Sequence, residues 1–548
     1  MDHLEHGREC YAHRAWADAY HALLRADHTA ALDVDDLDRL ATAAYLMGRD
    51  LEFQHIVARL YGVHVASGDR PRAARCAFWL ALTFLLRGDA GQSNAWTARG
   101  QRLVEDRDCA EAGYLSIAVA EQQLRDGREG EAFTTAGRAA AIGESCRDTD
   151  LTAAARHAQG RALIQQGDVV GGLKCLDETM LAVVRGELGP IMTGLMYCSV
   201  IDTCRQVYAL ERAGEWISAF SRFCEQQPEM AAFTGTCLVH RAEIMQLQGA
   251  WAEALAEARR ACERAQRADR KPPGAALYQQ AEIHRLRGEF EKAEDAYRAA
   301  SELGFEPQPG LALLRLAQGR ADAGNKAIRR LMSGASDENL SVFPQRRLRR
   351  AGVLPAQFEI MLASGDLEEA RRARDQLREL ANACDTDLLR AVVAQADGAI
   401  AIAEGRPHAA LDPLRRAFSL WERLDAPYEA ARVRVLIADA CRALGDDEAA
   451  GLEVEAARRV FERLGARPDL VRLDAPSARP PSPSKPVLTA RELHVLRLIS
   501  TGRTNKEIGE ELSLSERTID RHVTNILNKL AVRSRTAATT YAFDHKLF

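Results

Sequence analysis

Apolar residues recur at helical spacing along most of this 548-residue chain, and each amphipathic stretch ends at a glycine before a second stretch begins. The glycines lie near 40 residues apart, with extremes of 31 and 47: Gly48, Gly88, Gly127, Gly167, Gly214, Gly249, Gly288, Gly319, Gly365, Gly405 and Gly445. Five residues later there is often an alanine: Ala132, Ala219, Ala254, Ala293, Ala370, Ala410 and Ala450. Glycine ends a helix in the left-handed conformation, and alanine lets the next helix pack closely against it. The pattern predicts paired helices throughout.

The G-x-x-x-x-A spacing between paired helices resembles the tetratricopeptide repeat (TPR) over roughly residues 5–465. The period is longer than the family's value of about 34 residues, and HEAT-like pairing is the alternative. Such hairpins stack because none can bury its apolar face alone, so the resemblance implies an α-solenoid with a concave groove.

Three segments of the array gather Tyr, Gln, His or Pro residues that could line a groove for an unknown protein or small-molecule ligand: 196–202, 278–284 and 306–310. The alternative is that they make interhelical hydrogen bonds and turns. Cysteines such as Cys198 and Cys204 are expected to be core residues, with redox sensing as the alternative.

Composition indicates a reduced, cytoplasmic, non-membrane protein. The twelve cysteines form no C-x-x-C pair, the N-terminal segment lacks the pattern of a secretory signal, and no apolar run reaches membrane-spanning length. Net charge is −5 overall, but residues 486–548 carry ten Lys or Arg against seven Asp or Glu. A basic tail on an acidic body is typical of a nucleic-acid module joined to another domain.

The repeat pattern stops near Leu473, where residues 474–486 contain five prolines. Proline blocks helix formation, so this stretch predicts an extended linker. We therefore expect an all-α chain with a TPR-like array over 1–470, a linker over 471–486 and a four-helix domain over 487–548.

Capping residues divide the last domain into four short helices. Thr489 and Glu492 are spaced as a capping box, and Gly502 ends the first helix. Thr504 caps the second helix, which runs from Asn505 to Leu512. The tight turn at 513–514 leads to the third, capped by Ser515 and ending near Leu530, and Ser534 caps the fourth, which ends near Phe543.

The third helix has two unlike faces. The apolar face has spacings of four, three and four residues and consists of Ile519, Val523, Ile526 and Leu530. The polar face, suited to a DNA major groove, consists of Arg517, Asp520, Arg521, Thr524 and Asn528. Four cations flank it where phosphates would run: Lys506, Lys529, Arg533 and Arg535. For Arg535 the alternative is a structural salt bridge with the first or fourth helix, and for His522 it is packing against the second helix.

This domain resembles the LuxR-type helix-turn-helix family. The matching segments are Leu488-Thr489-x-Arg491-Glu492, Val495-Leu496, Thr504-Asn505-Lys506-Glu507-Ile508, Leu514-Ser515, Thr518-Ile519, His522-Val523, Asn525-Ile526, Lys529-Leu530 and Ser534-Arg535. The resemblance implies that Asp520, Arg521 and Thr524 face bases, that Lys506, Thr518, Asn525 and Lys529 contact phosphates, and that the fourth helix forms a dimer. The complete set expected to contact DNA is Thr504, Asn505, Lys506, Ser515, Arg517, Thr518, Asp520, Arg521, His522, Thr524, Asn525 and Lys529.

Two features depart from the family: Gly509 stands where alanine is usual, and Ala531 where glycine is common. Asp520 matters more, because its carboxylate is repelled by phosphates. It either accepts a hydrogen bond from a cytosine amino group or holds Arg517 or Arg521 in place.

These patterns predict a dimeric bacterial regulator that binds double-stranded DNA and senses a signal through its array. The alternative is an adaptor protein in which the C-terminal bundle serves dimerisation or docking. No phosphate-loop, H-E-x-x-H or G-x-S-x-G motif is present, so neither enzyme activity nor a cofactor or metal is expected.

Overall fold

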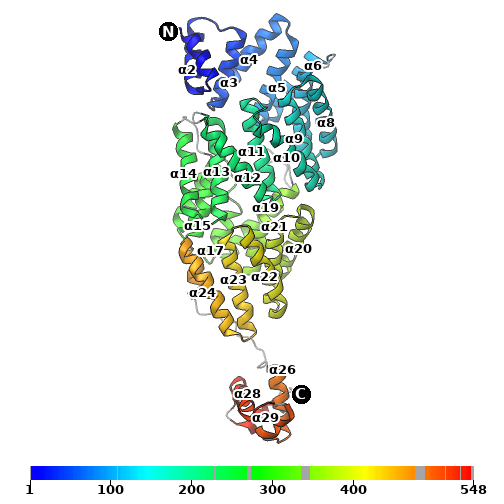
Figure 1. The fold of residues 1–548 in the computed structure, drawn as a ribbon, viewed down its shortest axis with the longest axis vertical. Helices are drawn as coiled ribbons and strands as arrows, with labels where there is room; N and C mark the ends of the chain where they lie inside the picture. The colour runs from blue at the N-terminus through cyan, green and yellow to red at the C-terminus, as the bar shows by residue number, and fades with distance from the viewer. Residues whose placement is uncertain are drawn as a thin grey trace. The chain divides into compact units, whose positions relative to one another are not determined.

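The computed structural model describes residues 2–105, 107, 109–227, 230–267, 273–334, 346–474, 488–512, 514–530, 532 and 534–544. Within these ranges the chain is helical and contains no strand, which confirms the all-α prediction. It divides into two compact units, Met1–Asp474 and Ala475–Phe548 (Figure 1). Among the described helices, none combines the length and hydropathy of a membrane-spanning segment.

The first unit consists of helical hairpins followed by one short helix. The helices are α1 (His3–Ala12), α2 (Trp16–Thr29), α3 (Val34–Leu46), α4 (Asp50–Ser67), α5 (Arg70–Leu86), α6 (Ala90–Val104), α7 (Ala110–Arg125), α8 (Glu129–Cys146), α9 (Thr149–Gln166), α10 (Val169–Val184), α11 (Pro190–Gln206), α12 (Leu210–Glu225), α13 (Ala231–Leu247), α14 (Trp251–Arg267), α15 (Gly274–Leu286), α16 (Phe290–Glu302), α17 (Gly310–Ala317), α18 (Ala321–Gly334), α19 (Arg346–Ala363), α20 (Leu367–Cys384), α21 (Asp387–Ala403), α22 (Pro407–Arg423), α23 (Pro427–Ala443), α24 (Asp447–Leu464) and α25 (Arg467–Asp474). Each odd-numbered helix up to α23 packs against the next helix, and from α5 to α23 it also contacts the next odd-numbered one. The result is a TPR-like α-solenoid.

The glycine marker works as predicted at every position except Gly214. The other ten glycines have φ between 69° and 101°, in the left-handed region. Gly214 lies inside α12, and Tyr208, with φ of 59°, makes the turn instead. The alanine five residues after Tyr208 is Ala213, which is fully buried, whereas Ala219 is only partly buried. The Gly214 prediction was wrong because a packed tyrosine replaces glycine at this turn.

Two further glycines allow α9 and α10 to approach closely. A Cβ atom on Gly172 would lie 2.5 Å from the carbonyl oxygen of Gly160. We expect Gly172→Ala to destabilise the unit by about 1–3 kcal/mol, because backbone atoms cannot easily yield. Gly214→Ala is the control, since its Cβ would meet nothing within 4 Å, and it should stabilise by about 0.5–1 kcal/mol. Thermal unfolding followed by circular dichroism measures the stability of both variants. Equal melting temperatures would contradict the close approach of α9 and α10 at Gly172.

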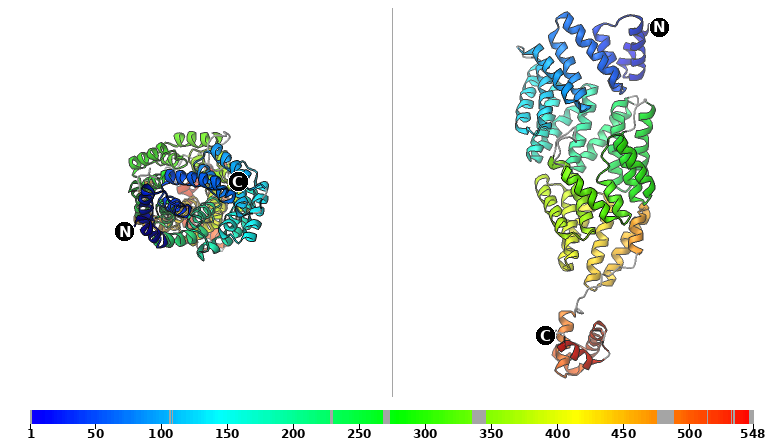
Figure 2. Two further views of the ribbon diagram at one scale, coloured as in Figure 1. Left: turned by 90° about the horizontal axis from the view of Figure 1, so that it is seen from above. Right: turned by 180° about the vertical axis from the view of Figure 1, so that it is seen from behind.

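Helices that are far apart in the sequence meet within the first unit. The Trp16 indole nitrogen donates to the Gln227 side-chain oxygen at 3.0 Å, and the rings of Tyr45 and Phe233 lie 6.0 Å apart. Viewed from above, the helices of this unit wind around a common axis (Figure 2). These contacts join the first hairpins to the middle of the solenoid, so its successive turns pack on one another.

The last helix of this unit, α25, is held by hydrogen bonds and ion pairs. The Tyr428 hydroxyl donates to the Asp469 carboxylate at 3.0 Å, and Arg458 pairs with Asp474 at 2.7 Å. Residues 471–474, where the linker was predicted to begin, are therefore helical. Residues 475–487, with all five linker prolines, lie outside the described residues.

The second unit has its own hydrophobic core. Its helices are α26 (Ala490–Ser500), α27 (Asn505–Leu512), α28 (Glu516–Lys529) and α29 (Arg535–Asp544). The buried core residues are Leu488, Val495, Leu496, Leu498, Ile499, Ile508, Ile519, Val523, Ile526, Leu530, Ala538 and Ala542. All four helices contribute, so the core fixes α28 against the other three.

Candidate nucleic-acid interface

The two faces of α28 are separated as the sequence predicted. Ile519 and Ile526 are fully buried, and Val523 and Leu530 are nearly so. The opposite face exposes Asp520, Arg521, Thr524, Asn525 and Lys529. The side chains of Arg517 and Asn528 lie outside the described residues, as do Ala531 and Arg533. Burial of one face leaves the polar face available to a ligand.

Capping residues fix where α26, α27 and α28 begin. Thr489 and Glu492 form the predicted capping box. Thr504 and Glu507 form a second: the Thr504 backbone N–H and hydroxyl both donate to the Glu507 carboxylate, at 2.7 and 2.9 Å. These bonds lower the pKa of the Glu507 carboxyl below its usual value. The same T-x-x-E spacing was visible in the sequence and overlooked there.

Ser515 and Thr518 face each other at the start of α28. The Thr518 backbone N–H donates to the Ser515 hydroxyl oxygen at 3.2 Å, and the two hydroxyls lie 2.7 Å apart. Ser515 thus caps the helix as expected. Both hydroxyls already have a partner in the unbound protein, although a hydroxyl oxygen keeps further acceptor capacity.

Asp520 is held by a residue that neither sequence interpretation named. The Asn505 amide donates to the Asp520 carboxylate at 2.7 Å, and the Asn505 carbonyl oxygen accepts a short hydrogen bond from Arg535. Arg535 also donates to the Arg503 carbonyl oxygen at 2.7 Å. This chain of bonds ties α27, α28 and α29 together and gives Arg535 a structural role. Asn505 and Asp520 are therefore joined to each other at the edge of the exposed face.

Lys529, expected to contact phosphate, forms an ion pair in the structure without DNA. Its amino group lies 2.7 Å from the Glu492 carboxylate, whose side chain is 5% exposed. Burial raises the pKa of the Glu492 carboxyl, but the bonds from Lys529 and Thr489 outweigh burial and hold the pKa below its usual value. The pair joins the start of α26 to the end of α28.

The remaining predicted residues keep their polar groups accessible. Lys506 and Arg521 are exposed, and within the described part of the unit neither has a hydrogen bond or ion pair. Asn525 is exposed, His522 is half-buried, and the Thr524 hydroxyl donates to the Asp520 carbonyl oxygen at 2.9 Å. Lys506 and Arg521 are thus the two free cations that the described structure offers to DNA at this face.

Lys529 and Lys506 form a matched pair for a test. Lys529→Ala leaves a buried carboxylate without its cation and should destabilise the second unit by about 1–3 kcal/mol. Lys506→Ala should change the free energy of unfolding by no more than about 0.5 kcal/mol. It should reduce the slope of the logarithm of the DNA-binding constant against the logarithm of the salt concentration by about one. Chemical denaturation measures the stability of each variant. Filter binding at several salt concentrations measures the salt dependence of its DNA binding. A Lys529→Ala protein of unchanged stability and lower salt slope would support the phosphate-contact prediction.

The candidate groove segments of the array mostly make interhelical contacts. Tyr278 packs edge-on against Tyr297 with ring centroids 5.6 Å apart, and His284 bonds to Glu289 at 2.8 Å. The Cys204 thiol is buried, which raises its pKa to about 12 and keeps it protonated. These observations support the alternative interpretation for the 278–284 segment and a core role for Cys204.

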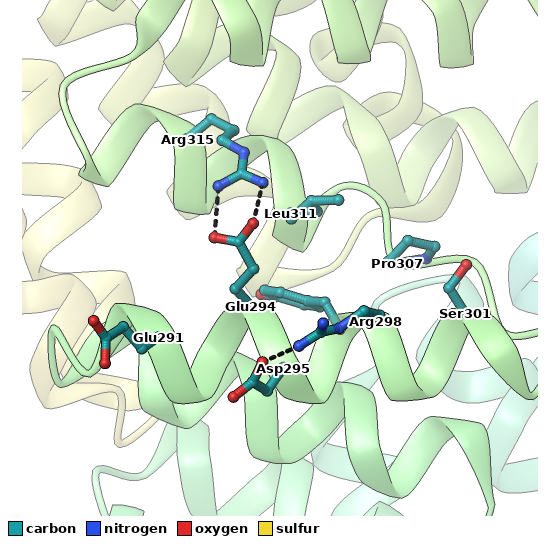
Figure 3. Close-up of a pocket in the computed structure, with 9 residues that line it drawn as sticks. Glu291, Glu294, Asp295, Arg298, Ser301, Pro307, Leu311 and Arg315 are labelled. Carbon is teal, nitrogen blue, oxygen red and sulfur yellow. Dashed lines mark hydrogen bonds and ion pairs between the residues drawn. The ribbon is translucent and has the colours of Figure 1, made fainter.

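Pro307, from the third segment, lines a surface pocket of about 640 Å³ between α16 and α17. Figure 3 shows that four of its five charged side chains are paired with each other: Arg315 donates to both Glu294 oxygens, at 2.7 and 2.9 Å, and Arg298 pairs with Asp295. Both guanidinium groups that line the pocket thus already have a carboxylate partner.

Comparison with known proteins relates the second unit to a family. Residues 486–542 match the family described as "Bacterial regulatory proteins, luxR family". The chain is 44% identical over 111 residues to the transcriptional regulatory protein LiaR of Bacillus subtilis (strain 168), covering 20% of this chain and 47% of LiaR. It is 46% identical over 61 residues to the response regulator protein VraR of Staphylococcus aureus (strain NCTC 8325 / PS 47), covering 11% and 29%. The match thus spans less than half the length of each relative.

Two solved structures resemble the chain over most of its length. One is a chain of the APC/C hetero-tetramer Cut9–Hcn1, with 11% identity and a TM-score of 0.35, covering 85% of this chain and 95% of that one. The other is yeast Tom70, with 12% identity and a TM-score of 0.27, covering 86% and 94%. Both TM-scores are too low to establish a shared fold.

Proposed function

We propose that this chain, whose C-terminal unit is a luxR-family helix-turn-helix domain, is a sequence-specific DNA-binding transcription regulator. The observation that carries the proposal is the polar face of α28, which exposes Arg521 and Thr524 opposite a fully buried apolar face. A helix of this kind fits the major groove, where a guanidinium can bind two acceptors of guanine. LiaR is a transcriptional regulatory protein and VraR is a response regulator protein, which supports the same function.

The proposed contacts are of two kinds: some position the protein on the DNA phosphates, and others read the bases. Lys506 and the N-termini of α27 and α28, which include Thr504, Ser515 and Thr518, are placed to position phosphates. Arg521, Thr524 and Asn525 occupy the exposed face that would meet bases and adjacent backbone. Asp520, held by Asn505, would accept from a cytosine amino group without lying free among phosphates.

We further propose that the protein binds DNA as a dimer through α29 and that its solenoid senses a signal. Phe543 of α29 is 63% exposed, so a second copy of the helix could cover it. Two copies would then read half-sites about one helical turn apart.

Selection of bound fragments from genomic DNA by the full-length chain tests this function. We expect enrichment of a short, roughly palindromic sequence, and gel shifts on it should show one cooperative complex. Binding without sequence preference, or none at all, would favour the adaptor alternative.

A further inference from the structure

Distant parts of the solenoid line a partly open cavity of about 280 Å³. Its walls come from α13, α15, α17, α19, α23 and α25, together with Trp251 at the start of α14. This volume is close to the lower limit of small-molecule sites, about 300 Å³. The cavity exists because the last hairpin packs back on the middle of the array, as the edge-on contact of Trp251 and Tyr428 at 5.3 Å shows.

The charges around this cavity do not balance. Four carboxylates line it against three guanidinium groups. Glu282 pairs with Arg285 at 2.6 Å, and Asp469 accepts from Tyr428 at 3.0 Å and lies 3.7 Å from Arg472. The other two carboxylates share a single cation.

Arg432 is that shared cation. It lies 2.8 Å from Glu359 and 3.2 Å from Glu429. Burial raises the pKa of the Glu429 carboxyl despite the neighbouring guanidinium. The Glu359 and Glu429 side chains keep 31% and 24% of their accessible surface, and both line the cavity. One negative charge in this wall therefore has no cation of its own.

The remaining wall is largely apolar and aromatic. Trp251, Leu286, Leu313 and Pro355 line it together with the ring of Tyr428. Trp251 is 2% exposed, and its indole N–H donates to the Gln246 carbonyl oxygen at 3.0 Å, so it packs behind the ring of Tyr428 and leaves that ring to face the cavity. Such rings attract cations in a desolvated site.

We propose that this cavity binds a small organic cation, an amine with an apolar body, whose ammonium group lies between Glu359 and Glu429 and whose body packs on Tyr428, Leu313 and Pro355. An anion fits the site less well, because each guanidinium already faces a carboxylate. This inference names the kind of signal that the proposed sensing role requires. It rests on the proposed function only where it expects amine binding to change DNA binding.

Helix α25 links amine binding to DNA binding, because it lines the cavity and precedes the DNA-binding unit in the chain. Pro468, Asp469 and Arg472 of this helix line the cavity, and the chain continues from Asp474 into the segment that leads to the DNA-binding unit. Occupancy would alter the contacts that hold α25, above all the Tyr428–Asp469 bond. The cavity thus lies beside the last helix of the first unit.

Calorimetry on the full-length chain with probes of matched shape and opposite charge tests the site. We expect tyramine and n-hexylamine to bind at least tenfold more tightly than 3-(4-hydroxyphenyl)propionate and heptanoate, and tyramine to change Trp fluorescence. Failure of both amines to bind, or equal binding of amines and carboxylates, would overturn the proposal.

Three variants locate the binding. Glu429→Gln should weaken tyramine binding at least tenfold, whereas Glu253→Gln, which changes an exposed carboxylate of α14, should not. Ala317→Leu fills the cavity from α17 and should abolish amine binding without lowering the melting temperature. If Glu429→Gln fails to fold, Ala317→Leu alone tests whether the amine binds in this cavity. Amine binding unaffected by Ala317→Leu would also overturn the proposal. DNA affinity is measured separately, so loss of DNA binding with intact amine binding would refute only the regulator function.

Discussion

Replacing Arg521 with alanine is expected to remove most of the preference of this protein for its specific DNA site. Arg521 is exposed on α28 and has no partner in the described part of the unit, so its guanidinium can reach a base pair without breaking an existing bond. A bidentate contact with guanine contributes about 1–3 kcal/mol, roughly a 5- to 150-fold change in Kd. Titration of the selected site and of a scrambled sequence measures the change.

Comparing the selected DNA site with the scrambled DNA distinguishes a base contact of Arg521 from a backbone contact. Binding to the scrambled site should fall much less than binding to the selected site. Lys506→Ala is the control, because loss of a phosphate contact weakens binding to both sequences alike. An Arg521→Ala protein that loses affinity equally for both would show that Arg521 contacts the DNA backbone.

Replacing Ile519 with alanine is expected to unfold the second unit while the solenoid stays folded. Ile519 is fully buried among all four helices, and truncating such a side chain costs about 2–5 kcal/mol. A domain of this size has little stability to lose. DNA binding should disappear. The intrinsic fluorescence should not change, because all six tryptophans precede residue 475.

Thr524→Ala serves as the control on the exposed side of the same helix. Its stability effect should stay within about 0.5 kcal/mol, because its hydroxyl bonds only within α28. Proteolysis that cleaves the second unit of Ile519→Ala and spares that of Thr524→Ala would confirm the difference. A cooperative, protease-resistant second unit in Ile519→Ala would contradict it.

The capping residues and the apolar spacing of the second unit were predictable because they act over one or two helical turns. Thr489 and Glu492 satisfy each other across three residues, and the buried face of α28 follows from spacings of three and four. The structure places both as expected. By the same local logic, ten of the eleven glycines predicted to end a helix do so.

Polar partners across the chain could not be predicted in this way. Asn505 meets Asp520 and Lys529 meets Glu492 only because the core of the unit brings separate helices together. Their side chains had several possible partners of suitable charge, and sequence separation does not choose among them. Hence the sequence indicated a phosphate contact for Lys529, which stays a prediction, but not the ion pair that Lys529 forms with Glu492.

The sequence by itself determined that the chain is helical, where its hairpins turn, and which face of α28 is buried, since these depend on short-range spacing and backbone conformation. Only the tertiary structure decided which charges are left for DNA and how the solenoid packs on itself. Packing of α23 and α25 against α13 to α15 forms the charged cavity, and that packing depends on side-chain shapes summed over hundreds of residues.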